Sequence, residues 1–216
     1  MAQVQPGDIK AQLPAAPPLA AEDFTTILTD LDRVIVPGLS HWQHPRFFGY
    51  FPSNGELASV LGDYLSTGLG VLGLSWQSSP ALTEVEEVAT DWMRQMVGLS
   101  DAWSGVIQDT ASSCTLVALL CARERTTDFS LVRAGLQAEA APLVVYVSAH
   151  SHSSVEKAAL LAGFGRANIR VIATDDRHAM RPDALAEAVA ADVAAGLRPC
   201  AVVATCGTTT TTAFDP

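Results

Sequence analysis

Lysine is scarce in this sequence: Lys10 and Lys157 are the only two among 216 residues. A mechanism that depends on a lysine amine therefore has two candidates. The net charge is −10 and no basic cluster occurs, which argues against a surface for nucleic acid or anionic membrane. No apolar run approaches the roughly 18 residues of a membrane span, so we expect no membrane-spanning segment.

Familiar site motifs are also missing. The sequence contains no GxGxxG, P-loop, HExxH or GxSxG pattern, and we expect no metal site. None of its four cysteines forms a CxxC pair, which predicts reduced structural thiols in a cytoplasmic protein. They are Cys114, Cys121, Cys200 and Cys206. The N-terminus lacks a basic region followed by an apolar core, so we expect no secretion signal.

What is present is apolar: 49% of residues are hydrophobic and 17% are charged, which suggests large buried interfaces. Composition divides the chain into a flexible Ala/Pro-rich arm (1–21), a helical segment (22–100) and a third segment (101–216). Helices are predicted over 22–36, 56–71 and 80–97. Ser79 is expected to cap the third of these, with Pro80 in its first turn.

From residue 101 the pattern alternates between strand and helix. Short apolar runs predict strands over 105–108, 143–148, 168–174 and 200–206, and helical periodicity separates them at 111–125, 153–163 and 182–195. This alternation predicts an α/β domain with a largely parallel sheet and flanking helices. The last strand lacks a covering helix before residue 216, so we expect an incomplete domain.

Three polar clusters follow predicted strands: 108–115, 149–154 and 205–212. The carboxyl ends of parallel strands share one edge of a sheet, where α/β proteins bind ligands. Free N–H groups and hydroxyls in the first cluster suit a phosphate, and His152 in the second can stack on a planar ring or transfer a proton. Helix capping, a structural histidine and the strand preference of threonine are the simpler explanations.

An aromatic run at 41–53 has no periodicity. Such a run suits a dimer interface, the wall of an apolar pocket or plain core packing.

Three segments resemble the pyridoxal-phosphate-dependent group II decarboxylases, of which aromatic-L-amino-acid decarboxylase is typical. They read HWQHPRFFGYFPS (41–53), GLSWQSSPALTEVE (73–86) and HSSVEKA (152–158), and VATCGTT (203–209) follows in the family's order. The resemblance covers residues 25–216. It implies the first part of the large domain of PLP fold-type I, the aspartate-aminotransferase-like fold, preceded by a helical arm.

The resemblance also assigns roles. It places the family's cofactor-stacking and acid histidine on His152, and its phosphate contacts on three small residues: Ala111, Ser112 and Thr209. It places the substrate pocket on Trp42, Tyr50, Phe51 and Ser53. The cofactor it implies is pyridoxal 5′-phosphate, and the implied assembly is a homodimer with its active site at the interface.

Two groups that the family requires have no counterpart in this sequence: the lysine that forms the Schiff base with the cofactor, and the aspartate that pairs with its pyridine nitrogen. The family's histidine helix turns the position of Lys157 away from the cofactor, and Lys10 lies in the arm. We therefore expect the chain alone to be inactive and to be the N-terminal part of a decarboxylase that is cleaved, truncated or completed by a complementary C-terminal chain.

The substrate is expected to be an L-amino acid, with the aromatic segment favouring an aromatic one. Decarboxylation coupled to aldehyde formation stays open, although His152 favours simple decarboxylation. The alternative is a non-catalytic fragment or pseudo-subunit with a structural role.

Overall fold

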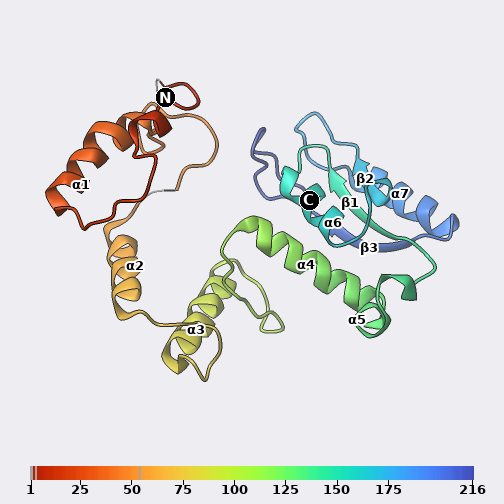
Figure 1. The fold of residues 1–216 in the computed structure, drawn as a ribbon. Coiled ribbons are helices and arrows are strands. Elements are labelled where there is room, and N and C mark those ends of the chain that lie inside the picture. The colour runs from red at the N-terminus through yellow and green to blue at the C-terminus, as the bar shows by residue number, and fades with distance from the viewer. Residues whose placement is uncertain (1, 3, 54) are drawn as a thin grey trace. The chain divides into compact units, whose positions relative to one another are not determined.

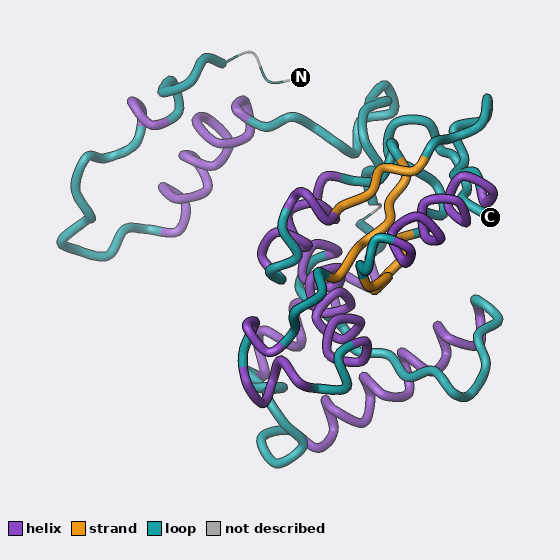
Figure 2. The backbone as a smooth tube through the Cα atoms, turned by 90° about the vertical axis from the view of Figure 1, so that its right-hand side faces the viewer, coloured by secondary structure: helices purple, strands orange, loops and turns teal. Residues whose placement is uncertain are grey.

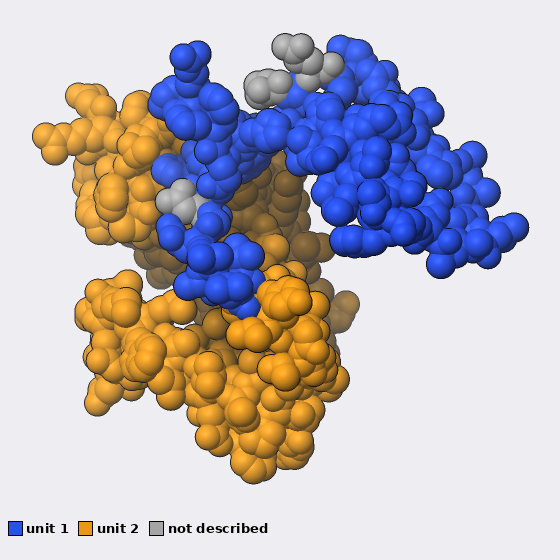
Figure 3. Space-filling view, turned by 90° about the vertical axis from the view of Figure 1, so that its left-hand side faces the viewer, with its two compact units in different colours: residues 1–61 blue, residues 62–216 orange. Residues whose placement is uncertain are grey.

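The computed structural model describes residues 2, 4–53 and 55–216, and these fall into two compact units, residues 1–61 and 62–216. Figure 3 colours the two units separately. The boundaries expected near residues 21 and 100 remain predictions.

The described part of the first unit consists of short helices and turns. Helix α1 (Phe24–Asp30) begins at Asp23, whose carboxylate accepts a hydrogen bond from the N–H of Thr25 at 2.8 Å. It continues as a π-helical turn (Leu31–Ile35) and a 3₁₀ turn (Val36–Gly38), which ends two residues beyond the predicted end at 36. A further 3₁₀ turn spans Lys10–Gln12, and α2 (Leu57–Leu69) crosses the boundary between the units.

After the end of α2, the first helix wholly within the second unit is α3 (Pro80–Met96). Pro80 opens this helix and Ser79 occupies its N-cap position, as predicted, but the Ser79 hydroxyl makes no capping hydrogen bond. Its backbone angles (φ −158°, ψ 87°) depart from the extended conformation usual at a cap. The remaining helices of this unit are α4 (Ala111–Thr126), α5 (Ser130–Ala134), α6 (Ser153–Leu161) and α7 (Pro182–Ala194), with 3₁₀ turns at Leu136–Ala138 and Arg166–Asn168.

Three parallel strands form the sheet, in the order β2-β1-β3. They are β1 (Leu143–Ser148), β2 (Ile169–Ile172) and β3 (Arg198–Val203). The predicted strand at 105–108 was wrong. That segment lies against α3 instead, where the N–H of Ile107 donates to the Glu86 carboxylate at 2.7 Å. A strand needs a neighbouring strand for its backbone groups, and in the described structure this segment has a side chain as its partner.

Helices cover both faces of the sheet (Figures 1 and 2). All six residues of β1 are buried, and its alternate side chains enter two separate cores. Leu143, Val145 and Val147 pack toward α4 and α6, whereas Val144 and Tyr146 pack toward α7. A central strand buried on both faces is apolar throughout, so the predicted parallel α/β architecture is confirmed.

One buried polar group joins the sheet to α7. The Tyr146 hydroxyl donates to the Asp192 carboxylate at 3.0 Å, and the Arg170 guanidinium donates to both oxygens of that carboxylate at 2.8–3.1 Å. Burial raises the pKa of Tyr146 to about 12, with the carboxylate beside it adding to the shift. The hydrogen bonds from Arg170 lower the pKa of Asp192.

Asp192→Asn should weaken the fold and flatten its dependence on acid pH. A carboxyl whose folded pKa lies below its unfolded value of ~3.9 adds stability above that value and loses it as the pH falls through the folded pKa. Urea unfolding measured from pH 7 to pH 3 should show the wild type and Asp192→Asn converging at low pH. Asp63→Asn, at an exposed position, is the control. Parallel curves for wild type and Asp192→Asn would show that the carboxylate charge contributes nothing.

Candidate functional site

His152 lies where β1 passes into α6, at the carboxyl edge of the sheet. Its ring caps the helix: Nδ1 accepts from the N–H of Ser154 at 3.2 Å and lies 2.9 Å from the Ser154 hydroxyl oxygen. A backbone N–H can only donate, so Nδ1 carries the lone pair and the proton of the neutral ring is on Nε2. The ring is exposed, so both its face and this N–H are available to a ligand.

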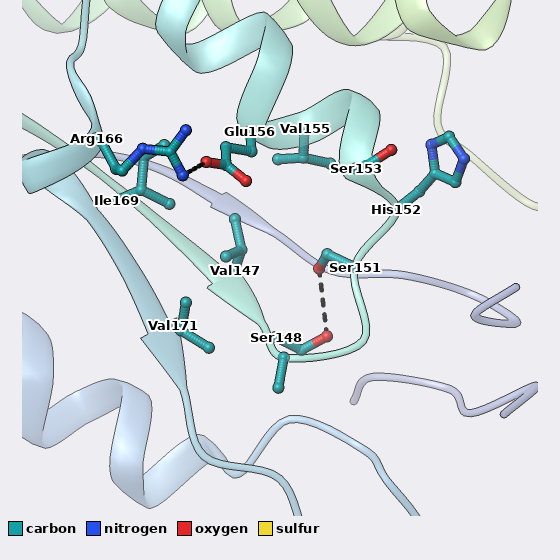
Figure 4. Close-up of a pocket in the computed structure, with 11 residues that line it drawn as sticks. Val147, Ser148, Ser151, His152, Ser153, Val155, Glu156, Arg166, Ile169 and Val171 are labelled. Carbon is teal, nitrogen blue, oxygen red and sulfur yellow. Dashed lines mark hydrogen bonds and ion pairs between the residues drawn. The ribbon is translucent and has the colours of Figure 1, made fainter. Parts of the chain in front are cut away.

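A cavity of about 320 Å³ opens beside this turn, between β2 and α6. The Ser148 and Ser151 hydroxyls lie 3.3 Å apart on one wall, and Glu156 pairs with Arg166 on another. Figure 4 shows the His152 ring pointing away from the ion pair and from both serines. The His152 ring therefore faces solvent at the carboxyl edge of the sheet and not these polar groups of the cavity.

The N-terminus of α4 lies at the same edge. Thr110 caps it by accepting from the N–H of Ser113 at 3.2 Å, and the Asp109 carboxylate accepts from the Ser113 hydroxyl. That bond from Ser113 lowers the pKa of Asp109. Ala111 and Ser112 are exposed in the first turn, and no described residue accepts a hydrogen bond from their N–H groups.

Helices α4 and α6 begin side by side. Ser112 and Ser113 line a cavity of about 290 Å³ together with Ser154 and Lys157, which lie on the first turns of α6. The two helices run in the same direction, so their positive ends meet at one place. Lys157 is exposed there, on the side of α6 that faces α4.

Thr209 lies in the loop that follows β3, and therefore also beyond the carboxyl edge. It is exposed, whereas the preceding Thr208 is completely buried. The first turn of α4, with Ala111 and Ser112, thus lies beside the start of α6, which His152 caps, while Thr209 follows β3 beyond the same edge.

These residues fit a phosphate attached to an aromatic ring. A phosphate needs N–H and hydroxyl donors, which the first turn of α4 and Thr209 supply. A planar ring needs a flat partner, which the exposed imidazole of His152 supplies. The cofactor that the sequence resemblance implies is therefore compatible with this edge.

The residues assigned to the substrate lie in the first unit. The ring of Trp42 stacks on Phe47 and on Tyr50, with centroids 5.3 and 5.2 Å apart. Phe51 is 60% exposed, and the backbone carbonyl of Ser53 accepts from the Gln43 side-chain amide. Because Trp42, Tyr50 and Phe51 are exposed, core packing within this chain does not explain the aromatic run.

Two residues have partners that sequence patterns did not reveal. His150 contacts His178 edge to face, with ring centroids 4.8 Å apart. The Asp215 carboxylate accepts from the N–H groups of Met180 and Thr205 at 2.7 and 2.9 Å. The sequence does not reveal these contacts. The contact of His150 with His178 depends on how the chain turns, and Asp215 binds backbone amides, which every residue except proline has.

Residues 6–216 match the family described as "Pyridoxal-dependent decarboxylase conserved domain". The chain belongs to this family.

Pyridoxal-dependent decarboxylases and related synthases are similar over the whole chain. The chain is 42% identical to phenylacetaldehyde synthase from Arabidopsis thaliana, covering 100% of this chain and 45% of that protein. It is also 42% identical to aromatic-L-amino-acid decarboxylase from Bos taurus, covering 98% of this chain and 45% of the relative. Among solved structures, tryptophan decarboxylase from Catharanthus roseus in complex with L-tryptophan superposes with a TM-score of 0.92 at 37% identity, covering 100% of this chain and 47% of that one.

The chain therefore spans about half the length of the decarboxylases it matches. In the described ranges no helix is both long and apolar enough to cross a membrane.

The four cysteines are free, and Cys200 is the most enclosed of them. Burial raises the pKa of its thiol, so it is a poor nucleophile at neutral pH.

Proposed function

We propose that this chain is the cofactor-anchoring N-terminal part of a pyridoxal-phosphate-dependent decarboxylase of aromatic L-amino acids. The observation that carries the proposal is the position of three features at the carboxyl edge of the sheet: the starts of α4 and α6 line one cavity, His152 caps α6, and the loop with Thr209 follows β3. Each contributes a group that this cofactor requires. The family membership and the decarboxylases among the relatives support it.

The phosphate group is assigned to the first turn of α4. The N–H groups of Ala111 and Ser112 and the Ser112 hydroxyl donate to it, and the positive end of the helix favours its charge. Thr209 contributes a second hydroxyl from the loop after β3. These contacts would fix the position of the phosphate at this edge of the sheet.

His152 is assigned to the ring. Its capping bond through Nδ1 sets the orientation of the imidazole and leaves the Nε2 proton on the exposed side. The imidazole would stack on the cofactor ring, and its Nε2–H would donate a hydrogen bond on that side. To act as a general acid, the ring would first take up a second proton at Nδ1 and release the N–H of Ser154. When bound, pyridoxal phosphate supplies the electron sink for the electrons left by loss of carbon dioxide.

The substrate pocket is assigned to Trp42, Tyr50, Phe51 and Ser53. The stacked rings of Trp42 and Tyr50 form a flat apolar surface suited to an aromatic side chain, and the Ser53 hydroxyl can donate to the substrate carboxylate. The relatives include tryptophan and tyrosine decarboxylases. Phenylacetaldehyde synthase among them keeps the aldehyde-forming reaction as a second candidate.

The chain by itself is proposed to bind the cofactor without catalysing the reaction. Lys10 and Lys157 are its only lysines. Lys10 lies in the first 3₁₀ turn and Lys157 on α6, and neither is assigned to the cofactor aldehyde. The active species is then a homodimer of complete protomers or a complex with a C-terminal chain. We place it in the cytoplasm, because free cysteine thiols persist in that reducing compartment.

Titration of the purified 216-residue chain with pyridoxal phosphate tests this proposal. We expect saturable binding that weakens when pyridoxal replaces pyridoxal phosphate, and no borohydride-reducible adduct in the intact mass. Adding the C-terminal half of a related decarboxylase should then release carbon dioxide from tryptophan or tyrosine.

Two results would contradict it. A stoichiometric reducible adduct would show that the chain carries its own catalytic lysine. Absence of cofactor binding, together with a stable complex that has no activity, would support the structural pseudo-subunit instead.

A further inference from the structure

The loop that carries Thr209 is a short closed structure. After β3 the chain turns back on itself: Cys206 and Phe214 form an antiparallel bridge, and the N–H groups of Gly207 and Thr208 both donate to the carbonyl of Ala213 at 2.9 and 3.0 Å. Thr209 and Thr210 lie at the exposed end of the loop. The position of Thr209 therefore depends on what holds the base of the loop.

Inside the loop, Thr208 provides one anchor. Its side chain is completely buried, and its hydroxyl lies 2.7 Å from the Thr211 hydroxyl and accepts from the N–H of Ala213 at 3.0 Å. Thr212, which lies between these two partners of Thr208, has a φ of 56°. This left-handed conformation is unfavourable for a β-branched residue. Strain of this kind persists only where surrounding contacts enforce it.

At the base, Asp215 provides the second anchor. One carboxylate oxygen accepts from the N–H of Thr205 at 2.9 Å, and the other accepts from the N–H of Met180 at 2.7 Å. The backbone N–H of Asp215 also donates to the carbonyl of Thr205 at 2.9 Å. Met180 is 4% exposed and packs in the core between the sheet and α7, so this carboxylate connects the loop to that core.

We propose that Asp215 is a positioning residue for the cofactor phosphate and acts through Thr209. By holding Thr205 and Met180 together, its two oxygens fix the loop that presents the Thr209 hydroxyl at the sheet edge. The proposal rests on the proposed function, because it takes Thr209 to contact the phosphate.

The chemistry of the carboxylate makes the role testable by a small change. Both oxygens accept from backbone amides, so both must be acceptors. In Asp215→Asn one of them becomes an amide nitrogen that can only donate, and one backbone N–H loses its partner. Asp176→Asn is the matched control, since it removes the same charge from an exposed residue of the β2–α7 connection.

The experiment measures the affinity of the full 216-residue chain for pyridoxal phosphate and for pyridoxal, with amide hydrogen exchange on the same samples. Asp215→Asn should lose roughly tenfold in affinity for pyridoxal phosphate and nothing for pyridoxal, while Asp176→Asn changes neither. In a Thr209→Val background, Asp215→Asn should cause no further loss. Exchange should accelerate at the amides of Thr205 and Met180.

Equal losses for the two ligands, or additive effects of Asp215→Asn and Thr209→Val, would overturn the proposal, because either result means that Asp215 acts on the fold in general. The proposal would also be overturned if Asp215→Asn bound pyridoxal phosphate as tightly as Asp176→Asn does. If the wild type binds no pyridoxal phosphate, the proposed function and the phosphate role fail together. Exchange at Thr205 and Met180 then decides whether Asp215 holds the loop at all.

Discussion

Ser112→Asp is expected to lower the affinity of the chain for pyridoxal phosphate by roughly a hundredfold or more. The new carboxylate would lie in the first turn of α4, where the phosphate is assigned. Two unit charges about 4 Å apart repel by about 4 kcal/mol at an effective dielectric constant of about 20, and about 2.7 kcal/mol already corresponds to a hundredfold change. Fluorescence or absorbance titration measures the effect.

Loss of binding in this variant would not reflect loss of the fold. An acidic side chain in the first turn stabilises a helix by interacting with its positive end, so the melting temperature should stay the same or rise. Ser112→Ala removes one hydrogen bond to a charged group and should cost roughly tenfold. Ala118→Asp, which adds the same charge at an exposed position farther along α4, should leave affinity unchanged.

If Ser112→Asp and Ala118→Asp weakened binding equally, the assignment of the phosphate to the start of α4 would be wrong. The same conclusion would follow if pyridoxal, which lacks the phosphate, lost as much affinity as pyridoxal phosphate.

The sequence predicts the sheet well because β1 carries its own signal. The run 143–147 is apolar without alternation, which indicates a strand buried on both faces, and the helices at Ser153 and Pro182 begin at recognisable positions. The segment 105–108 has the same composition as a short strand, yet it contacts Glu86 of α3. Composition cannot distinguish these outcomes, because the result depends on whether a neighbouring strand is within reach.

The candidate site divides in the same way. The sequence predicts where His152 and Ser112 lie because these residues follow or begin elements that the sequence reveals, whereas their roles stay predictions. The bonds made by His152 and Asp215 were not predictable. A histidine accepting from the N–H two residues ahead depends on the local turn, and Asp215 bonds to amides 10 and 35 residues away. Backbone amides have no side-chain identity from which such contacts could be read.

Leu119→Ala should destabilise the second unit by about 2–5 kcal/mol. Leu119 is 3% exposed and packs on the face of the sheet that α4 and α6 cover. Shortening it removes apolar contacts and leaves a cavity in the core that it shares with Val145, Ala158 and Phe164, and such a core relaxes only partly around a cavity. Urea unfolding followed by circular dichroism measures the loss.

Leu161→Ala is the matched control. Leu161 is also a helical leucine, on α6, but it is 77% exposed, so its truncation should change the free energy of unfolding by no more than about 0.5 kcal/mol. Equal effects of the two substitutions would mean that α4 does not pack on the sheet as described. Since α4 positions Ser112 beside the start of α6, that result would also remove the structural basis for the phosphate assignment. A large loss for Leu119→Ala alone would support the packing that brings the two helix starts to one edge.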